Sequence, residues 1–336
     1  MRSIFIAMSL FKIEKGVLNS LLAVLQKEFE IIAPVKNSAV RFQSIKDPEE
    51  IYLDAISYFP AKEYFFRKKE VLFGFKGLKI AVPELEKPKR IFFGLRKCDL
   101  NAIKHQDKVF LETVKDPYYS AMRENSILIG YHCNTAPSKY CFCGTLNLQD
   151  YYDLLFFDRG EIFYVDVGTE KGQRLIDSQK KFFEPIDYQL TVEDRKISNA
   201  GRLLTDDISE FYDNHLWTDG INNCLSCGAC TALCPTCYCF EMHDEVSTKN
   251  IKNGERIRNW SSCQLREFTK VAGNHVFRNS RDARFKHRIY HQLQYFREKN
   301  GVNLCVGCGR CIAGCPTRID FVEIINEMKN GQEKKQ

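Results

Sequence analysis

Long hydrophobic runs are missing from this sequence. Across 336 residues, no uninterrupted apolar stretch approaches the roughly 18 residues that indicate a membrane-spanning helix. The N-terminal segment MRSIFIAMSLFKIEKG is partly apolar, but it has no clear small-residue cleavage site, and Lys12, Glu14 and Lys15 follow at once. We therefore expect a first strand rather than a signal peptide, and a cytoplasmic protein that is not inserted in a membrane.

Several common functional fingerprints are also missing. The sequence has no G-x-G-x-x-G after a strand, no G-x-x-x-x-G-K-S/T and no G-x-S-x-G, so no motif indicates nucleotide or flavin binding. The formal net charge is a modest +6, and much of it lies in Arg278–Arg297 without a motif that reads nucleic acid. We interpret this stretch as a solvated helix face that balances negative charge nearby, and we expect no nucleic-acid partner.

Cysteine, in contrast, is abundant and unevenly distributed. Residues 1–97 contain none, four lie between Cys98 and Cys143, residues 144–223 contain none, and eleven lie from Cys224 onward. The total of fifteen is odd, so the chain cannot pair all of its cysteines in internal disulfides. Clustered cysteines in a reducing compartment are more often metal ligands.

The patterns of apolar residues divide the chain into two predicted domains. Helical patterns cover residues 16–28, 99–110 and 117–124, and short apolar runs typical of strands cover residues 29–35, 70–74, 91–95 and 127–130. Residues 156–167 suggest a hairpin, and residues 173–209 have a polar helical pattern. Alternating strands and helices favour an α/β domain over residues 1–205.

The second predicted domain covers residues 206–336. Short helices are expected around its cysteine runs, and Ser280–Lys299 has the pattern of one long helix between them. We therefore expect an all-α dicluster ferredoxin-like domain, followed by disorder after Lys329.

Eight cysteines form two runs with the same spacing. Both fit the bacterial ferredoxin pattern C-x2-C-x2-C-x3-C-P without a gap. The first run consists of Cys224, Cys227, Cys230 and Cys234, and the second of Cys305, Cys308, Cys311 and Cys315. Zinc sites favour two C-x2-C pairs with four ligands in total, so a third cysteine, a Cys-Pro end and duplication of the run argue against zinc. The pattern predicts two 4Fe–4S clusters.

The spacing also predicts which cysteines share a cluster. Three thiolates two residues apart let a tight loop wrap around one cubane, and the fourth points away toward a second cluster. We expect crossed ligation, with cluster I held by Cys224, Cys227, Cys230 and Cys315, and cluster II by Cys305, Cys308, Cys311 and Cys234.

Four further cysteines form a less standard set in the first domain. Cys98 and Cys133 each follow a predicted strand, and Cys141 and Cys143 lie in the next loop. Because the carboxyl ends of neighbouring parallel strands converge, these four thiols are expected at one site. We expect a third 4Fe–4S cluster at this site, with a four-thiolate zinc site and metal-free buried cysteines as the open alternatives.

Three cysteines and one histidine are left over. Cys237, Cys239 and Cys263 lack an obvious fourth partner, so we interpret them as small buried side chains near cluster II, with ligation of a further centre as the alternative. His132 adjoins Cys133 and is the histidine whose position most invites a ligand role.

With these residues in view, the chain resembles the beta subunit of cytoplasmic nickel–iron hydrogenases of the sulfhydrogenase type, a family that also includes the corresponding iron–sulfur subunit of anaerobic sulfite reductase. The resemblance covers nearly the full length. It rests on these segments: Gly94–Ile103, Cys133 with Cys141-Phe-Cys143, Cys224–Phe240, Trp260–Cys263, Phe268–Gly273 and Cys305–Asp320. The sequence departs from the family at Lys97, where proline is usual, and at Asn274, where a second glycine is common.

The resemblance implies an anaerobic electron-transfer subunit of a hetero-oligomer. Such subunits relay electrons between a flavin- and NAD(P)-binding partner and a catalytic redox partner, here a nickel–iron hydrogenase or a sulfite reductase. Clusters without a substrate-site motif independently suit transfer rather than bond chemistry. Two alternatives stay open: a reductase of polysulfide or sulfite that acts at the N-terminal cysteines, and a structural module whose cysteines hold zinc.

Overall fold

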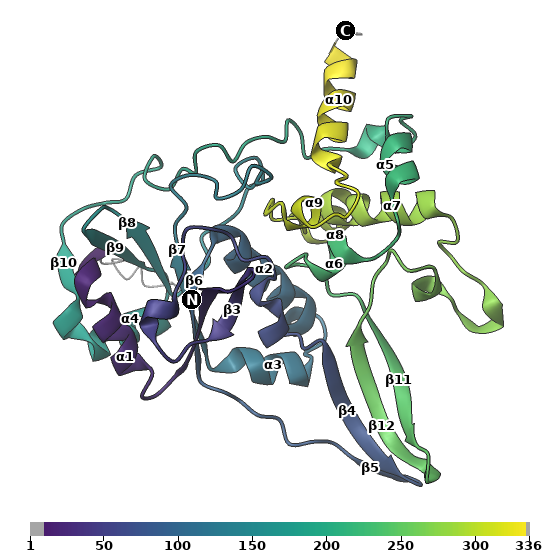
Figure 1. Ribbon diagram of the computed structural model, residues 1–336, viewed down its shortest axis with the longest axis horizontal. Coiled ribbons are helices and arrows are strands. Elements are labelled where there is room, and N and C mark those ends of the chain that lie inside the picture. Colours follow the sequence, from purple (N-terminus) through teal and green to yellow (C-terminus); the bar gives the residue numbers. More distant parts are fainter. Residues whose placement is uncertain (1–9, 334–336) are drawn as a thin grey trace, which may run out of the picture.

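A large mixed sheet forms the first half of the protein. The computed structural model describes residues 10–333, and its larger sheet has eight strands in the order β10-β1-β9-β8-β7-β6-β2-β3 (Figure 1). The strands, in that order, are β10 (Glu184–Ile186), β1 (Leu10–Glu14), β9 (Ile162–Val167), β8 (Leu154–Asp158), β7 (Ser126–Tyr131), β6 (Arg90–Leu95), β2 (Glu30–Lys36) and β3 (Val40–Ser44). Strands β2, β6, β7 and β8 run parallel, and the remaining pairs are antiparallel.

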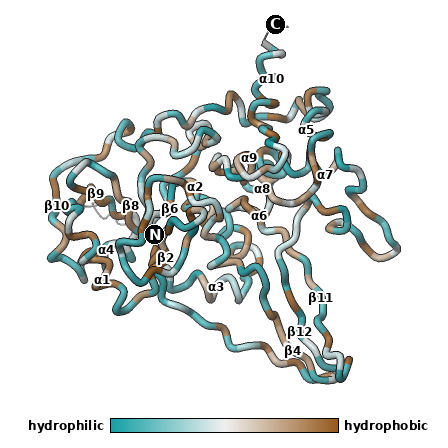
Figure 2. Tube along the Cα trace, in the orientation of Figure 1, coloured by the Kyte–Doolittle hydropathy of each residue, from teal (hydrophilic) through white to brown (hydrophobic). Residues whose placement is uncertain are grey.

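Helices cover both faces of this sheet, because successive side chains of a strand point to opposite faces. On β6, Ile91 and Phe93 pack in one core with helices α1 (Leu18–Leu25) and α4 (Glu170–Ser178). Phe92, between them, packs in the other core with helices α2 (Lys97–Asp107) and α3 (Pro117–Glu124). Figure 2 shows hydrophobic segments on strands of this sheet, among others in the chain.

Most of the expected N-terminal elements are confirmed. The helix expected over residues 117–124 is α3, where Asp116 accepts a hydrogen bond from the Tyr119 amide and Pro117 occupies the first turn. The predicted hairpin is β8 and β9. The helical pattern over residues 173–209 is wrong beyond Ser178, where α4 ends and β10 and irregular chain follow. Of the expected N-terminal strand, residues 1–9 lie outside the described residues, and the rest is β1.

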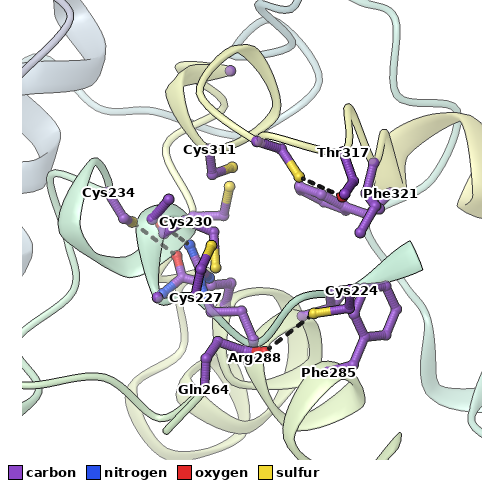
Figure 3. A pocket seen from close by; sticks show the side chains of 18 of the residues that line it. Cys224, Cys227, Cys230, Cys234, Gln264, Phe285, Arg288, Cys311, Thr317 and Phe321 are labelled. Carbon is purple, nitrogen blue, oxygen red and sulfur yellow. Dashed lines mark hydrogen bonds between the residues drawn. The ribbon is translucent and has the colours of Figure 1, made fainter. Parts of the chain in front are cut away.

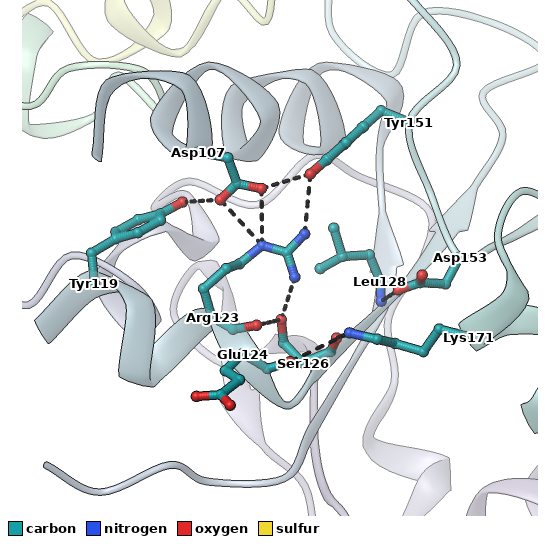
Figure 4. A network of polar contacts seen from close by, with 9 residues as sticks. All are labelled: Asp107, Tyr119, Arg123, Glu124, Ser126, Leu128, Tyr151, Asp153 and Lys171. Atoms are coloured by element: carbon teal, nitrogen blue, oxygen red, sulfur yellow. Dashed lines mark hydrogen bonds and ion pairs between the residues drawn. The ribbon is translucent and has the colours of Figure 1, made fainter. Parts of the chain in front are cut away.

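Helices α2 and α3 are joined by a polar network on one face of the sheet (Figure 4). The Arg123 guanidinium donates from Nε to both carboxylate oxygens of Asp107, at 3.1 and 3.2 Å. It also donates to the Ser126 hydroxyl at 2.7 Å and to the Tyr151 hydroxyl at 3.1 Å. Since Asp107 in turn accepts from Tyr151, the network fixes the end of α2 relative to the strands.

The expectation of an all-α second domain is wrong. Strands β11 (Phe240–Ser247) and β12 (Asn250–Trp260) form a hairpin, and β12 also pairs with β4 (Lys69–Lys76), which continues into β5 (Lys79–Ala81). This four-stranded sheet projects from the body as an arm (Figure 1). The hairpin strands are mostly polar and exposed, so no apolar alternation marked them in the sequence.

The predicted boundary near residue 205 remains a prediction. The strand expected over residues 70–74 is β4, but it pairs with β12 from beyond that boundary rather than with the large sheet. At the base of the arm, the buried Arg258 guanidinium makes ion pairs with Glu70 and Asp116, so one cation of the second half neutralises two carboxylates of the first.

Short helices carry the remainder of the chain around a third core. They are α5 (Trp217–Asn223), α6 (Ala229–Ala232), α7 (Arg281–Tyr290), α8 (Phe296–Asn300), α9 (Arg310–Ala313) and α10 (Phe321–Glu333). A π-helical segment, His291–Tyr295, joins α7 to α8, so the long helix expected from Ser280 is confirmed with one irregular turn. Because α10 continues to Glu333, disorder does not begin after Lys329, and residues 334–336 lie outside the described residues. No helix in the described part of the chain is long and apolar enough to cross a membrane.

Candidate iron–sulfur centre

One cavity brings together the eight cysteines of the two ferredoxin-type runs (Figure 3). It lies between the first run, the second run and helix α7. Its wall is otherwise largely apolar, with Phe142, Phe285, Ile289 and Phe321 among the lining residues. A largely apolar cavity lined by thiols suits a polynuclear iron–sulfur centre.

The two cysteine loops have the same local conformation. In each loop, the residue two positions after the first cysteine has a left-handed backbone: Ser226 in the first loop and Gly307 in the second. The amide of each of these residues donates a hydrogen bond to the sulfur of that first cysteine at 3.4 Å. The glycine after the second cysteine, Gly228 or Gly309, is also left-handed, with φ of 78° and 71°, and precedes a four-residue helix. Left-handed positions turn the chain tightly and aim amides at sulfur.

The fourth cysteines of the runs also have matching surroundings. The sulfurs of Cys234 and Cys315 lie 3.2 and 3.5 Å from the hydroxyls of Thr236 and Thr317, each two residues further on. Burial raises the pKa values of Cys305, Cys308 and Cys311, and negative charge on Cys234 raises each of them further. Cys234 of the first run is therefore near all three loop cysteines of the second.

An arginine without a carboxylate partner faces the same cavity. Among the described residues, no Asp or Glu side chain pairs with Arg288, which donates to the Cys230 carbonyl at 3.2 Å and leaves its buried Nε without a hydrogen bond. Burial favours the neutral form, but negative charge on the surrounding cysteines, Cys237, Cys234 and Cys230 foremost, holds the pKa of Arg288 well above its usual range. A buried cation that has no carboxylate partner is costly unless other negative charge lies beside it, so the site fits a group with negative charge.

The sequence pointed to the stretch that contains Arg288, but it did not indicate a second buried cation, Lys62. The basic stretch Arg278–Arg297 was expected to balance negative charge nearby, and Arg288 does face the cavity. It is not a wholly solvated face, since Arg284 is buried and donates to the Gln264 carbonyl. Lys62 comes from the other half of the chain, and no local pattern marked it. Its buried ammonium donates to the carbonyls of Thr231 and Cys237 at 3.1 and 3.2 Å.

The four N-terminal cysteines converge against the second cysteine loop. The Phe142 amide donates a backbone hydrogen bond to the Gly307 carbonyl at 2.8 Å, which joins the two loops directly. The Cys141 sulfur lies 3.9 Å from the Cys308 carbonyl oxygen. A Cβ atom added at Gly307 would lie 2.5 Å from the Cys143 backbone, so the close approach requires glycine there.

The same four thiols lie within electrostatic reach of one another. Burial raises the pKa values of Cys141 and Cys143 to about 11 and about 12, and it raises those of Cys98 and Cys133 as well. Negative charge on Cys143 raises the pKa of Cys98, and charge on Cys133 raises those of Cys141 and Cys143. Without a bound metal these thiols are therefore neutral, and binding iron would release their protons.

A buried ion pair holds the N-terminal cysteines against the second run. Arg310, between Cys308 and Cys311, lies 2.9 Å from the Asp99 carboxylate, and both side chains are almost fully buried. Arg310 also donates to the carbonyl and hydroxyl oxygens of Ser57, at 2.7 and 2.8 Å. The residue after Cys98 is thus bonded to a residue inside the second cysteine loop.

The remaining candidates have less direct positions. Cys237 and Cys263 are buried and Cys239 is half-buried. His132 is buried, burial lowers its pKa to about 4, and its Nε2 has no hydrogen-bond partner. The described residues contain no group of three or more His, Cys, Asp or Glu side chains arranged to hold a single metal ion.

Comparison with known proteins agrees with this geometry. Residues 223–319 match the family model of a 4Fe-4S dicluster domain, which supports two 4Fe–4S clusters in this chain. The chain is also similar to the sulfhydrogenase 2 subunit beta of Pyrococcus furiosus, with 33% identity over 90% of this chain and 92% of that protein. The protein is an iron–sulfur electron-transfer subunit and belongs to the sulfhydrogenase beta-subunit family.

Proposed function

We propose that this chain relays electrons between a flavin- and NAD(P)-binding subunit and the catalytic subunit of a nickel–iron hydrogenase. The observation that carries the proposal is the single cavity that gathers all eight cysteines of two loops with matching conformation. Bound clusters supply one-electron transfer without making or breaking substrate bonds. The protein's own residues hold the clusters and balance their charge through Arg288.

Ligation in the proposed relay is crossed. Cluster I takes Cys224, Cys227, Cys230 and Cys315, and cluster II takes Cys305, Cys308, Cys311 and Cys234. The proximity of Cys234 to the second run supports the assignment of cluster II. Replacing Cys315 with alanine should damage cluster I, which anaerobic EPR of the reduced protein can detect. Loss of the cluster II signal instead would reject the crossed assignment.

We also propose a third 4Fe–4S cluster at Cys98, Cys133, Cys141 and Cys143. The contact between the Cys141–Cys143 loop and the second cysteine loop supports a place next to cluster II. Anaerobic reconstitution of the full chain should then give iron and sulfide equivalent to three cubanes, and Cys141→Ser should lose one. Iron equivalent to two cubanes in both proteins would reject the third cluster.

Two alternative functions are separated from the relay by simple assays. The iron–sulfur subunit of a sulfite reductase would co-purify with a sirohaem protein rather than with a nickel–iron protein. A reductase acting at the N-terminal cysteines would reduce polysulfide or sulfite by itself with an artificial electron donor. The relay predicts that the reconstituted chain alone is inactive in that second assay, so turnover there would reject it.

A further inference from the structure

A buried lysine from the first half of the chain holds the segment that carries the fourth cysteine of the first run. The Lys62 ammonium donates to the carbonyl oxygens of Thr231 and Cys237, at 3.1 and 3.2 Å. Cys234, the proposed first-run ligand of cluster II, lies three residues from each of them. The two hydrogen bonds therefore attach one side chain to both ends of a short segment that is centred on a cluster ligand.

The contacts of Lys62 are those of a charged ammonium. Lys62 is 4% exposed, and its Nζ lies 4.2 Å from the centre of the Trp260 ring, within the range of a cation–π interaction. No carboxylate in the described part of the chain pairs with it. Burial lowers the pKa of Lys62, and negative charge on Cys237 and Cys234 raises it. Because cysteines that bind a metal are thiolates, a loaded site supplies the negative charge that this buried cation lacks.

Lys62 acts from a different cavity than Arg288. Arg288 lines the cavity that the two cysteine runs share. Lys62 lines an adjoining cavity together with Cys227 and Trp260. The charge balance assigned to Arg288 therefore does not include Lys62, whose charge reaches the clusters through the polypeptide of the first run.

A neutral side chain anchors the same segment. Gln106, in helix α2, is 1% exposed and donates from Nε2 to the Pro235 carbonyl at 3.0 Å. Pro235 directly follows Cys234. Gln106 thus holds the segment by a hydrogen bond, as Lys62 does, but it adds no charge, and comparing the two separates the effect of charge from that of anchoring.

We propose that Lys62, through its positive charge, raises the reduction potential of the cluster to which Cys234 is a ligand. The proposal rests on the ligand sets of the proposed relay. One-electron reduction adds one negative charge at the ligands, and a fixed cation beside the segment of Cys234 stabilises that charge. Two unit charges about 10 Å apart, at an effective dielectric constant of about 20, change an equilibrium constant roughly tenfold. A tenfold change corresponds to about 59 mV in a one-electron potential.

The test is an EPR-monitored redox titration of the full chain, with its clusters reconstituted under anaerobic conditions. Lys62→Met keeps the apolar stem and removes the charge, so the equilibrium constant for reduction should fall about tenfold, which lowers the potential by about 59 mV. Lys62→Gln keeps a hydrogen-bond donor but not the charge, and it should lower the potential by a similar amount. The matched control is Gln106→Leu, which removes a hydrogen bond to the same segment and should shift the potential little. All three variants should keep the iron content of the unmodified protein.

Three results would overturn the proposal. The first is an unchanged potential in Lys62→Gln, and the second is a shift in Gln106→Leu as large as that in Lys62→Met, since either would assign the effect to anchoring rather than to charge. The third is loss of one cluster's iron in both Lys62 variants, which would make Lys62 necessary for assembly of the site. The relay is tested separately by the iron content and EPR signals of the unmodified protein, so an unshifted potential rejects the role of Lys62 and leaves the relay in place.

Discussion

The ion pair between Asp99 and Arg310 gives the sharpest test of how the two halves are held together. The two side chains are 3% and 2% exposed and their charged atoms lie 2.9 Å apart. Asp99→Asn keeps the shape of the side chain but leaves the Arg310 charge buried with only the two Ser57 oxygens as close neutral partners. Removing one partner of a buried ion pair costs about 3–5 kcal/mol.

This cost should be visible as a lower melting temperature. At roughly 2–4 °C per kcal/mol for domains of about 150–250 residues, Asp99→Asn should lower the Tm by about 10 °C. Differential scanning calorimetry under anaerobic conditions measures the shift. The matched control is Lys87→Met, which removes a pair of similar length, 2.8 Å, whose side chains are half-exposed, and it should leave the Tm nearly unchanged.

A double-mutant cycle then isolates the pair from its surroundings. With Arg310→Met added, no buried charge is left unpaired, so the double variant should be more stable than the sum of the single effects predicts, by about 2 kcal/mol. Strictly additive effects, or an Asp99→Asn shift no larger than that of Lys87→Met, would show that this contact does not hold the N-terminal cysteines against the second run.

Single positions give three further predictions. Gly307 and Gly301 both have left-handed backbones, but of the two only Gly307 would bring a Cβ against the Cys143 backbone. Gly301→Ala should therefore lower the free energy of unfolding by about 1 kcal/mol, while Gly307→Ala should also lower the iron content at the N-terminal cysteines. Equal iron in the two variants would contradict this. Burial lowers the pKa of His105 from 6.5 to about 4, so the unfolded chain takes up the proton before the folded chain does as the pH falls. The free energy of unfolding should therefore fall between pH 6.5 and pH 4, by about 1.4 kcal/mol per pH unit for this residue. His105→Phe should make the Tm fall less steeply over that range, and an unchanged slope would reject this assignment. Arg123→Met leaves the Asp107 carboxylate without its cation and should cost about 3 kcal/mol, measured as a lower Tm; Arg123→Lys should recover only part of the loss because lysine cannot make the same set of hydrogen bonds.

The local spacing of residues determined much of this protein. The ferredoxin-type cysteine spacing requires loops of one conformation, and both loops have it, with left-handed glycines at Gly228 and Gly309. Periodicity and end signals likewise located α3 and the β8–β9 hairpin, because these features depend on neighbours within a few residues.

The tertiary structure decided what depends on distant parts of the chain. The polar strands β11 and β12 are stabilised by pairing with each other and with β4, which comes from the first half of the sequence, so local patterns could not reveal the arm. Lys62 reaches the first cysteine run from the other half of the chain for the same reason. The spacing of cysteines thus predicted the clusters, but only the packing of the two halves placed Lys62 and Arg288 around the thiols. The reason is that a buried charge is positioned by its whole environment rather than by its neighbours in sequence.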